Sequence, residues 1–195
     1  MIIAITAWKG GVGKTTTAVH LGAYFQAQAP TLIIDADRNR SALIWAREDQ
    51  LPCYVASQAG STHLIRKYPH IIVDTRARPE PEEFRDLAEG SDLLIVPTTP
   101  NHLDVDATFK AVEQLGSLKT DYRILLTKVD SRTKTGREAK ARLKAAKLPM
   151  FKTEIPLLVA FERASQQGVV VQDCGDPKAN FAWRKYQAIG REILA

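Results

Sequence analysis

The stretch Lys9-Gly10-Gly11-Val12-Gly13-Lys14-Thr15-Thr16 decides the fold, because a glycine-rich turn that ends in Lys-Thr is typical of a polyphosphate-binding loop. Its glycines let backbone N–H groups approach phosphate oxygens with little obstruction from Cβ atoms. Lys14 is long enough to reach the β- and γ-phosphates, and the hydroxyl of Thr15 is suited to ligate Mg²⁺. The whole stretch, from Lys9 to Thr16, is therefore predicted to bind a nucleotide.

The segments on either side of the turn support this interpretation. Residues 2–7 form an apolar run typical of a buried strand, and residues 15–28 carry apolar side chains at helical spacing. A strand, a glycine turn and a helix in this order point the N-terminus of the helix at an anion. The alternative is a glycine turn that only links a strand to a helix.

The turn departs from the usual pattern at its start, where Trp8 stands in place of the first glycine and Lys9 adds a second cation. Two ammonium groups on the same phosphate oxygens repel each other unless several phosphate charges offset them. One resolution is that Lys9 neutralises a nucleotide held by another subunit. A surface salt bridge is the alternative.

Four further apolar runs alternate with segments long enough for crossover helices; they lie at residues 31–34, 71–73, 93–96 and 123–127. Continuous apolar runs suit strands that helices cover on both faces. The pattern predicts an α/β fold with a doubly wound, mostly parallel sheet and helices on both faces. Residues 1–195 are expected to form a single domain. Residues 76–81, which carry two arginines and two prolines, are predicted to form a loop.

Composition narrows the class of protein. No stretch approaches the ~20 apolar residues that a membrane-spanning helix needs, and the N-terminus lacks the features of a secretory signal. Cys53 and Cys174 do not form a metal-type spacing, so a reduced, cytoplasmic compartment is the default expectation. The net charge of +5 suggests an anionic partner besides the nucleotide.

The motifs together resemble the ParA/MinD family of ATPases, which carry a deviant Walker motif with a lysine at its start. The resemblance covers nearly the whole chain: it includes the turn, Asp35-Ala36-Asp37, the strand that ends at Asp74 and the run from Leu93 to Pro100. In length the chain is similar to small plasmid-partition and carboxysome-positioning ATPases. The resemblance implies a P-loop NTPase fold and an ATP-bound homodimer in which Lys9 reaches across to the partner's nucleotide.

The same resemblance implies roles for individual residues. Lys9, Lys14 and Asp37 would be catalytic, with Asp37 orienting the attacking water. Thr15 and Asp74 would hold Mg²⁺, so ATP and Mg²⁺ are the expected cofactors. The alternatives are a helix-capping role for Asp74 and a solvated loop for Asp37, whereas Asp35 would either support the metal or cap the end of its strand. Thr127 and Pro156 would lie at the adenine.

Two departures from the family leave the rate of hydrolysis open. Arg38 stands where relatives often have proline, and Thr75 to Arg78 replace a Pro or Gly that commonly follows the metal-binding aspartate. Arg76 or Arg78 would contact a phosphate or the partner subunit. The alternative is that both are solvated loop charges.

Two groups of basic residues are candidates for DNA binding. In the first, four residues at helical spacing form one stripe, opposite a buried side made of Ala139, Leu143 and Ala146. The second group lies near the C-terminus. An ordinary solvated face is the alternative, and the absence of a base-reading motif favours non-specific binding. The predicted DNA contacts are Arg132, Lys134, Arg137, Lys140, Lys144, Lys147, Lys178, Arg184 and Lys185.

The C-terminal segment distinguishes two branches of the family. Asp176 and Pro177 are typical of the start of a helix, and the apolar stripe that follows is expected to pack on the sheet rather than on a membrane. That stripe contains Phe181, Tyr186, Ile189 and Ile193.

The resemblance thus implies a weak, Mg²⁺-dependent ATPase that converts ATP to ADP and phosphate. Its ATP-bound dimer would bind nucleoid DNA non-specifically in the cytoplasm. An adaptor of the ParB or McdB type would stimulate hydrolysis and link the dimer to a plasmid or a carboxysome. A membrane-associated, MinD-like division-site ATPase and a P-loop metabolic ligase are the alternatives.

Overall fold

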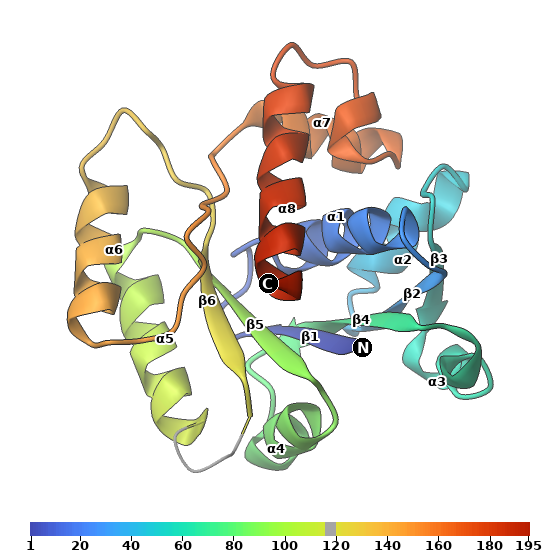
Figure 1. Ribbon diagram of the computed structural model, residues 1–195, viewed down its shortest axis with the longest axis horizontal. Coiled ribbons are helices and arrows are strands. Elements are labelled where there is room, and N and C mark those ends of the chain that lie inside the picture. The colour runs from blue at the N-terminus through green and yellow to red at the C-terminus, as the bar shows by residue number, and fades with distance from the viewer. Residues whose placement is uncertain (116–119) are drawn as a thin grey trace.

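A computed structural model describes residues 1–115 and 120–195 (Figure 1). In the described residues, six strands form one parallel sheet in the order β3-β2-β4-β1-β5-β6. This arrangement confirms the predicted doubly wound parallel sheet. The strands are β1 (Ile2–Ala7), β2 (Thr31–Ala36), β3 (Tyr54–Ser57), β4 (His70–Ala77), β5 (Leu93–Thr98) and β6 (Tyr122–Leu126).

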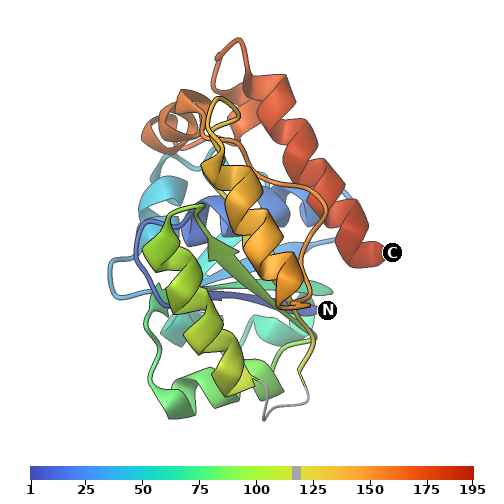
Figure 2. The same ribbon diagram turned by 90° about the vertical axis from the view of Figure 1, so that its left-hand side faces the viewer.

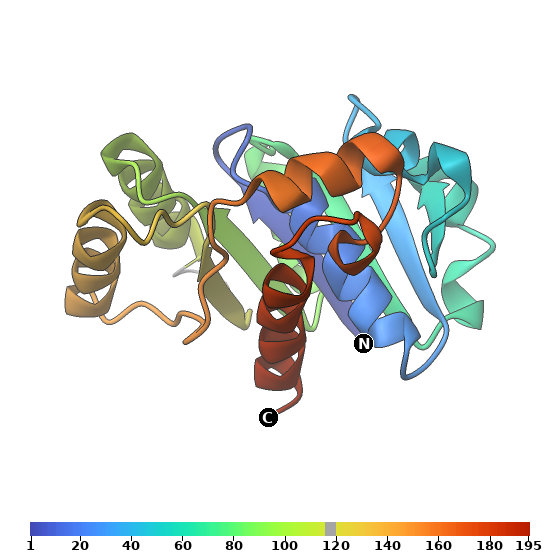
Figure 3. The same ribbon diagram turned by 90° about the horizontal axis from the view of Figure 1, so that it is seen from above.

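Helices cover both faces of the sheet (Figures 1 and 3). One face carries α1 (Lys14–Gln26), α2 (Ser41–Trp45), α7 (Val159–Gln167) and α8 (Ala179–Leu194). The other face carries α3 (Gln58–Ser61), α4 (Pro81–Glu89), α5 (His102–Leu115) and α6 (Thr135–Ala145). Short 3₁₀ turns lie at η1 (Ala46–Glu48), η2 (Ile65–Lys67) and η3 (Val171–Asp173).

The core follows the alternation of side chains along each strand. On β1, Ile3 and Ile5 belong to the cluster that packs against α1 and α8, whereas Ala4 packs with Phe84 and Ala88 of α4. These residues are almost completely buried. Burial on both faces explains why the strands are continuous apolar runs in the sequence.

β4 does not end at Asp74 as predicted, because its pairing with β1 and β2 continues beyond that residue, and three further differences from the predicted elements stand out. β3 was not predicted, because this edge strand is short and its Tyr54 side chain is 56% exposed. The predicted loop at residues 76–81 is wrong at both ends, since Arg76 and Ala77 belong to β4 and Pro81 begins α4.

The third difference concerns the start of α8. Asp176 does not cap this helix, which begins at Ala179. Instead the Asp176 carboxylate pairs with Arg163 and accepts a hydrogen bond from the N–H of Lys178. These two contacts use the carboxylate in the connection before the helix.

α8 lies next to α1 (Figure 1). Its apolar stripe packs against the cluster that α1 forms with the sheet. Tyr186 and Ile189 are buried and Ile193 contacts the same cluster, but Phe181 lies outside it and is 44% exposed. The hydroxyl groups of Tyr186 and Thr17 lie 3.3 Å apart, at hydrogen-bonding distance. The C-terminal helix is thus attached to the helix that follows the glycine turn.

At the other edge of the sheet, α5 and α6 lie side by side (Figure 2). Arg142 of α6 donates to Asp106 of α5 at 2.8 Å, and the Arg142 guanidinium lies 5.6 Å from the centre of the Phe109 ring. Ligands of open α/β sheets bind beyond the carboxyl ends of the parallel strands, where the loops of this chain lie.

Candidate nucleotide-binding site

The glycine turn connects β1 to α1 and has a backbone that requires glycine. Gly11 and Gly13 have φ angles of 76° and 90°, in the left-handed region that side chains with a Cβ rarely adopt. Gly13 occupies the N-cap of α1, so no side chain competes for the first amide groups of the helix. The Thr127 hydroxyl donates to the carbonyl of Val12 at 2.7 Å, which fastens the turn to the end of β6.

The turn lines a cavity of about 570 Å³. Lys14 lies at its base and is only 7% exposed. Val12 does not line the cavity, because its side chain is buried under the turn. The structure brings most of the predicted phosphate-binding residues together here: Gly10, Gly11, Gly13, Lys14, Thr15, Thr16 and Asp37.

Lys9 has a different environment from Lys14. Its ammonium group lies 2.9 Å from a carboxylate oxygen of Asp104 on α5, and it does not line the phosphate cavity. The Thr99 hydroxyl donates to the other Asp104 oxygen at 2.6 Å. Asp104 was not predicted, and no local sequence signal connects residues so far apart. The salt bridge that was the alternative role for Lys9 is present in the single chain.

Asp74 is buried beside the turn, inside β4 and three residues before that strand ends at Ala77. Neither of its carboxylate oxygens has a hydrogen-bond partner among the described residues. Burial raises the pKa of Asp74 to about 7, although the nearby Thr15 hydroxyl and Lys14 ammonium act in the opposite direction. A buried carboxylate without a partner costs free energy unless a cation compensates for it.

Thr15 and Asp74 fit a magnesium ion by their chemistry. Mg²⁺ prefers oxygen ligands and is commonly held by one or two carboxylates together with substrate phosphates. The orphaned oxygens of Asp74 lie close to the Thr15 hydroxyl, next to the phosphate cavity. These two side chains would hold the ion, whose charge would offset that of the phosphates.

Asp35 shapes the loop that carries Asp37. One Asp35 oxygen accepts from the N–H of Asp37 at 3.0 Å, and the other accepts from the N–H of Leu43 at 2.9 Å. Both oxygens are thus used by the backbone, which favours the strand-end role over a metal-supporting role. Asp37 itself is half-buried and lines the cavity.

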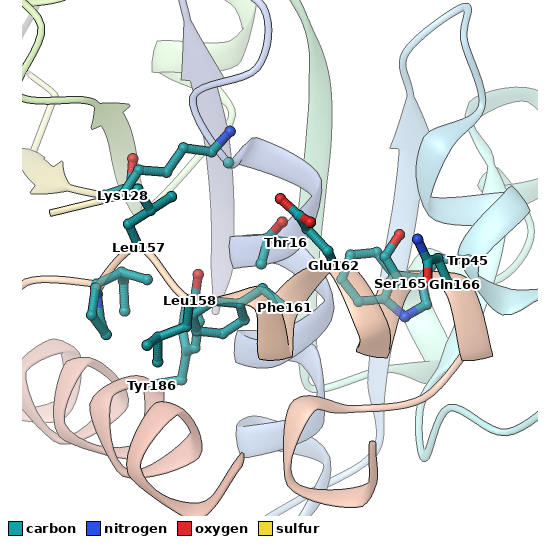
Figure 4. Close-up of a pocket in the computed structure, with 14 residues that line it drawn as sticks. Thr16, Trp45, Lys128, Leu157, Leu158, Phe161, Glu162, Ser165, Gln166 and Tyr186 are labelled. Atoms are coloured by element: carbon teal, nitrogen blue, oxygen red, sulfur yellow. The ribbon is translucent and has the colours of Figure 1, made fainter. Parts of the chain in front are cut away.

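A second cavity of about 370 Å³ adjoins the first, and Gly13 and Thr16 line both. Figure 4 shows this second cavity. Thr127 and Pro156, predicted for the adenine, line this second cavity. The hydroxyl of Thr127 is directed at the Val12 carbonyl, so its contribution to the cavity is largely apolar.

The remaining walls of this second cavity come from residues that were not predicted. Leu157, Leu158 and Phe161 supply apolar surface, while Glu162 and Ser165 of α7 supply polar groups (Figure 4). An apolar cavity with a few polar groups suits a planar base. The sequence offered little signal for it, since Leu157 and Leu158 lie in the connection before α7, and Phe161, Glu162 and Ser165 belong to an ordinary amphipathic helix.

His20 joins the glycine turn to the C-terminal part of the chain. Its Nδ1 lies 2.6 Å from the Thr16 carbonyl, and its Nε2 accepts from the N–H of Val171 at 3.0 Å. The ring stacks on Tyr186, with 4.7 Å between ring centres. Complete burial lowers the pKa of His20 to about 4, so the imidazole is neutral and donates through Nδ1.

The basic residues of the first group differ in their exposure and in whether a carboxylate pairs with them. Arg137 and Lys144 are exposed on α6, whereas Lys140 pairs with Glu154 and Arg132 pairs with Asp130. Lys134 and Lys147 are exposed just outside the two ends of the helix. Ala146, expected on the buried side, is exposed because α6 ends at Ala145.

The C-terminal basic group lies at the start and along the outer side of α8. Lys178 and Arg184 are exposed, and the Lys185 ammonium lies 5.2 Å from the centre of the Phe181 ring. Arg132 and Lys178 line one groove, so the two basic groups approach each other at that point. Within the described part of the chain, no helix has the length and apolar character needed to cross a membrane.

The parallel sheet, the glycine turn at the N-terminus of α1 and the buried Lys14 define a P-loop nucleotide-binding protein. The chain belongs to the CobQ/CobB/MinD/ParA nucleotide binding domain family, which matches residues 3–171.

Relatives narrow this assignment within the family. The chain is 30% identical over 204 residues to the maintenance of carboxysome distribution protein A of Gloeobacter kilaueensis, an alignment that covers 98% of this chain and 93% of the relative.

Two solved structures share the fold. One is a variant of McdA from Cyanothece in complex with ATP, with a TM-score of 0.75 at 19% identity, covering 97% of this chain and 96% of the other. The second is the MinC:MinD cell division protein complex of Aquifex aeolicus, with a TM-score of 0.78 at 19% identity, covering 99% and 95%.

The unpartnered carboxylate predicts opposite effects of Asp74→Asn on stability and on nucleotide binding. Removing the buried charge should raise the free energy of unfolding of the metal-free and nucleotide-free protein by about 1 to 3 kcal/mol. The same change should reduce the gain in nucleotide affinity that Mg²⁺ provides. Urea unfolding at pH 8 and nucleotide titration with and without Mg²⁺ measure the two effects. Asp121→Asn, at an exposed position, is the control; a variant less stable than the parent would contradict this account of Asp74.

Proposed function

We propose that this chain is an ATPase whose ATP-bound form dimerises and positions a cargo on DNA. The contrast between its two lysines carries the proposal. Lys14 is buried within the phosphate cavity, whereas Lys9 lies outside it and faces the surface near α5. The buried ammonium group would bind the chain's own nucleotide, and the other would bind a nucleotide held by a second copy.

The Lys9–Asp104 contact is weak enough for Lys9 to move from Asp104 to a nucleotide of a second copy. Lys9 is one third exposed, and salt bridges of such residues typically contribute only about 0 to 1 kcal/mol. A triphosphate carries several negative charges and attracts an ammonium group more strongly than one carboxylate does. Lys9 would therefore leave Asp104 when a second subunit brings its ATP within reach.

Hydrolysis at this site would depend on positioning and charge. Lys14 and Lys9 would stabilise the charge that develops on the transferred phosphoryl group, and Asp37 would orient the attacking water. Bound Mg²⁺ would add compensating charge. Basal turnover should be slow and partner-stimulated, because fast hydrolysis would dissolve the dimer before it reached its cargo.

The proposed cargo and adaptor are chosen by analogy with the relatives. The relative from Gloeobacter kilaueensis is named for carboxysome distribution, and the chain is similar to it over nearly its full length. We therefore propose a carboxysome or a plasmid as cargo, and an adaptor of the McdB or ParB type that stimulates hydrolysis. The membrane-bound alternative has less support, because the apolar stripe of α8 is largely occupied by α1.

The proposal predicts that DNA binding depends on the nucleotide. The chain should retard a random-sequence DNA duplex with ATP and Mg²⁺, but not with ADP or without nucleotide. Lys14→Ala should lose the ATP-dependent retardation because it removes the buried phosphate contact. Asp37→Ala should retain ATP and prolong the retarded state. A gel shift with all three nucleotide conditions measures this, and equal retardation in each would refute the proposal.

The exposed residues of α6 predict where DNA binds. Arg137→Glu combined with Lys144→Glu should weaken DNA retention at least about tenfold at 100 mM salt, because charge reversal removes two phosphate contacts and adds repulsion. ATP binding should not change. Lys140→Glu is the comparison, since Lys140 already pairs with Glu154. If the double variant keeps full retention, the DNA site lies on α8 or elsewhere.

A further inference from the structure

Arg76 is a cation of the phosphate cavity to which the proposed function gives no role. It belongs to β4, two residues beyond Asp74, and lines the same cavity as Lys14 and Asp37. A register shift between β1 and β4 accompanies this position, because Ile5 pairs with Asp74 but Ala7 pairs with Ala77. Such a bulge redirects side chains and is frequent next to active sites.

In the nucleotide-free chain, a carboxylate of α4 holds Arg76. The Arg76 Nε donates to Glu83 Oε2 at 2.8 Å, and a terminal nitrogen of the guanidinium lies 2.6 Å from the same oxygen. Glu80 lies 3.8 Å away and adds a second negative charge. The side chain of Arg76 is 25% exposed, so it lies at the edge of the cavity rather than in open solvent.

The carboxylates that hold Arg76 also begin α4. Glu80 is the N-cap of this helix, and Glu83 accepts a hydrogen bond from the N–H of Glu80 in a reciprocal capping box. The position of the guanidinium is thereby linked to the first turn of α4. Phe84, the next residue of this helix, packs edge-to-face on Trp8 with 4.5 Å between ring centres. Trp8 is adjacent to Lys9 in the chain.

A terminal phosphate would compete with Glu83 for this guanidinium. A phosphate group carries about 1.5 to 2 negative charges near neutral pH, whereas a carboxylate carries one. Arginine also matches phosphate oxygens in a two-pronged geometry, which makes such contacts stronger than those between neutral groups. Asp37 lines the same cavity as Arg76. Arg76 thus lies near the residue proposed to orient the attacking water.

We infer that Arg76 binds the γ-phosphate, and that Glu83 restrains it in the chain without ATP. This inference rests on the proposed ATP site and adds a residue that distinguishes ATP from ADP. When the γ-phosphate is present, Arg76 leaves Glu83, and the first turn of α4 loses the cation that lies between its two carboxylates. The presence of the γ-phosphate is thereby transmitted to the helix that packs on Trp8.

Two neutral substitutions test the inference, because they should change ATP affinity in opposite directions. Arg76→Gln should weaken binding of a non-hydrolysable ATP analogue about tenfold, because it removes one charged hydrogen-bonding group. Its affinity for ADP should stay within about twofold of the parent value. Glu83→Gln should tighten binding of the analogue by at least about twofold, since less attraction holds Arg76 back. Calorimetric titration in Mg²⁺ buffer measures both nucleotides.

Controls separate this role from a purely structural one. Arg85→Gln changes the net charge by the same amount as Arg76→Gln, but at an exposed position on α4. It should alter neither the affinity for the analogue nor that for ADP. Thermal unfolding without nucleotide should show Glu83→Gln to be less stable than the parent, because it weakens the cap of α4. The double variant Arg76→Gln/Glu83→Gln should bind the analogue as weakly as Arg76→Gln alone.

The outcomes also distinguish the inference from the proposed function. The inference is wrong if Arg76→Gln lowers the affinities for the analogue and for ADP equally, or changes neither affinity. If Lys14→Ala also abolishes binding of both nucleotides, the ATP site stands. If the unaltered chain binds neither nucleotide, the proposed function itself fails. Tighter analogue binding by Glu83→Gln that persists in the double variant would also overturn the inference, since it would not depend on Arg76.

Discussion

The glycine turn carries two lysines, one buried in the phosphate cavity and one near the surface, and the rest of the site depends on this difference. The left-handed backbone at Gly11 and Gly13 lets the turn wrap around the phosphate cavity, with Lys14 buried at its base. Lys9, at the start of the turn, remains outside and pairs with Asp104. A turn with a single lysine could bind a nucleotide equally well, so Lys9 needs a separate explanation. We propose that the nucleotide of a second copy provides it.

Charge balance explains the neighbouring groups. The Asp74 carboxylate is buried without a partner, and its pKa is raised to about 7 mainly by that burial. Arg76 is held by Glu83 at the edge of the same cavity. One group lacks a cation and the other has a replaceable anion, so Mg²⁺ and a triphosphate would satisfy both. In the nucleotide-free chain, Asp74 thus lacks a compensating cation, and Arg76 has a carboxylate where the phosphate would bind.

The sequence predicted the parts of the fold and site that depend on neighbouring residues. Buried strands were visible as apolar runs, and the glycine turn was visible because its residue types are directly required by its backbone. The edge strand β3 was not visible, since it is only partly buried and short. The helix start at Asp176 was predicted wrongly: its carboxylate accepts from the N–H of Lys178 and pairs with the distant Arg163, and the helix begins only at Ala179. The partners of Lys9 and Arg76 likewise depend on tertiary contacts that no local pattern contains.

The central claim is that two lysines of different copies act on one triphosphate, and sedimentation velocity tests it most directly. The chain should sediment as a dimer with Mg²⁺ and a non-hydrolysable ATP analogue, and as a single copy with ADP. Lys9→Ala should bind the analogue but remain a single copy. A single species for the unaltered chain with the analogue, or a dimer that forms equally well with Lys9→Ala, would contradict the account.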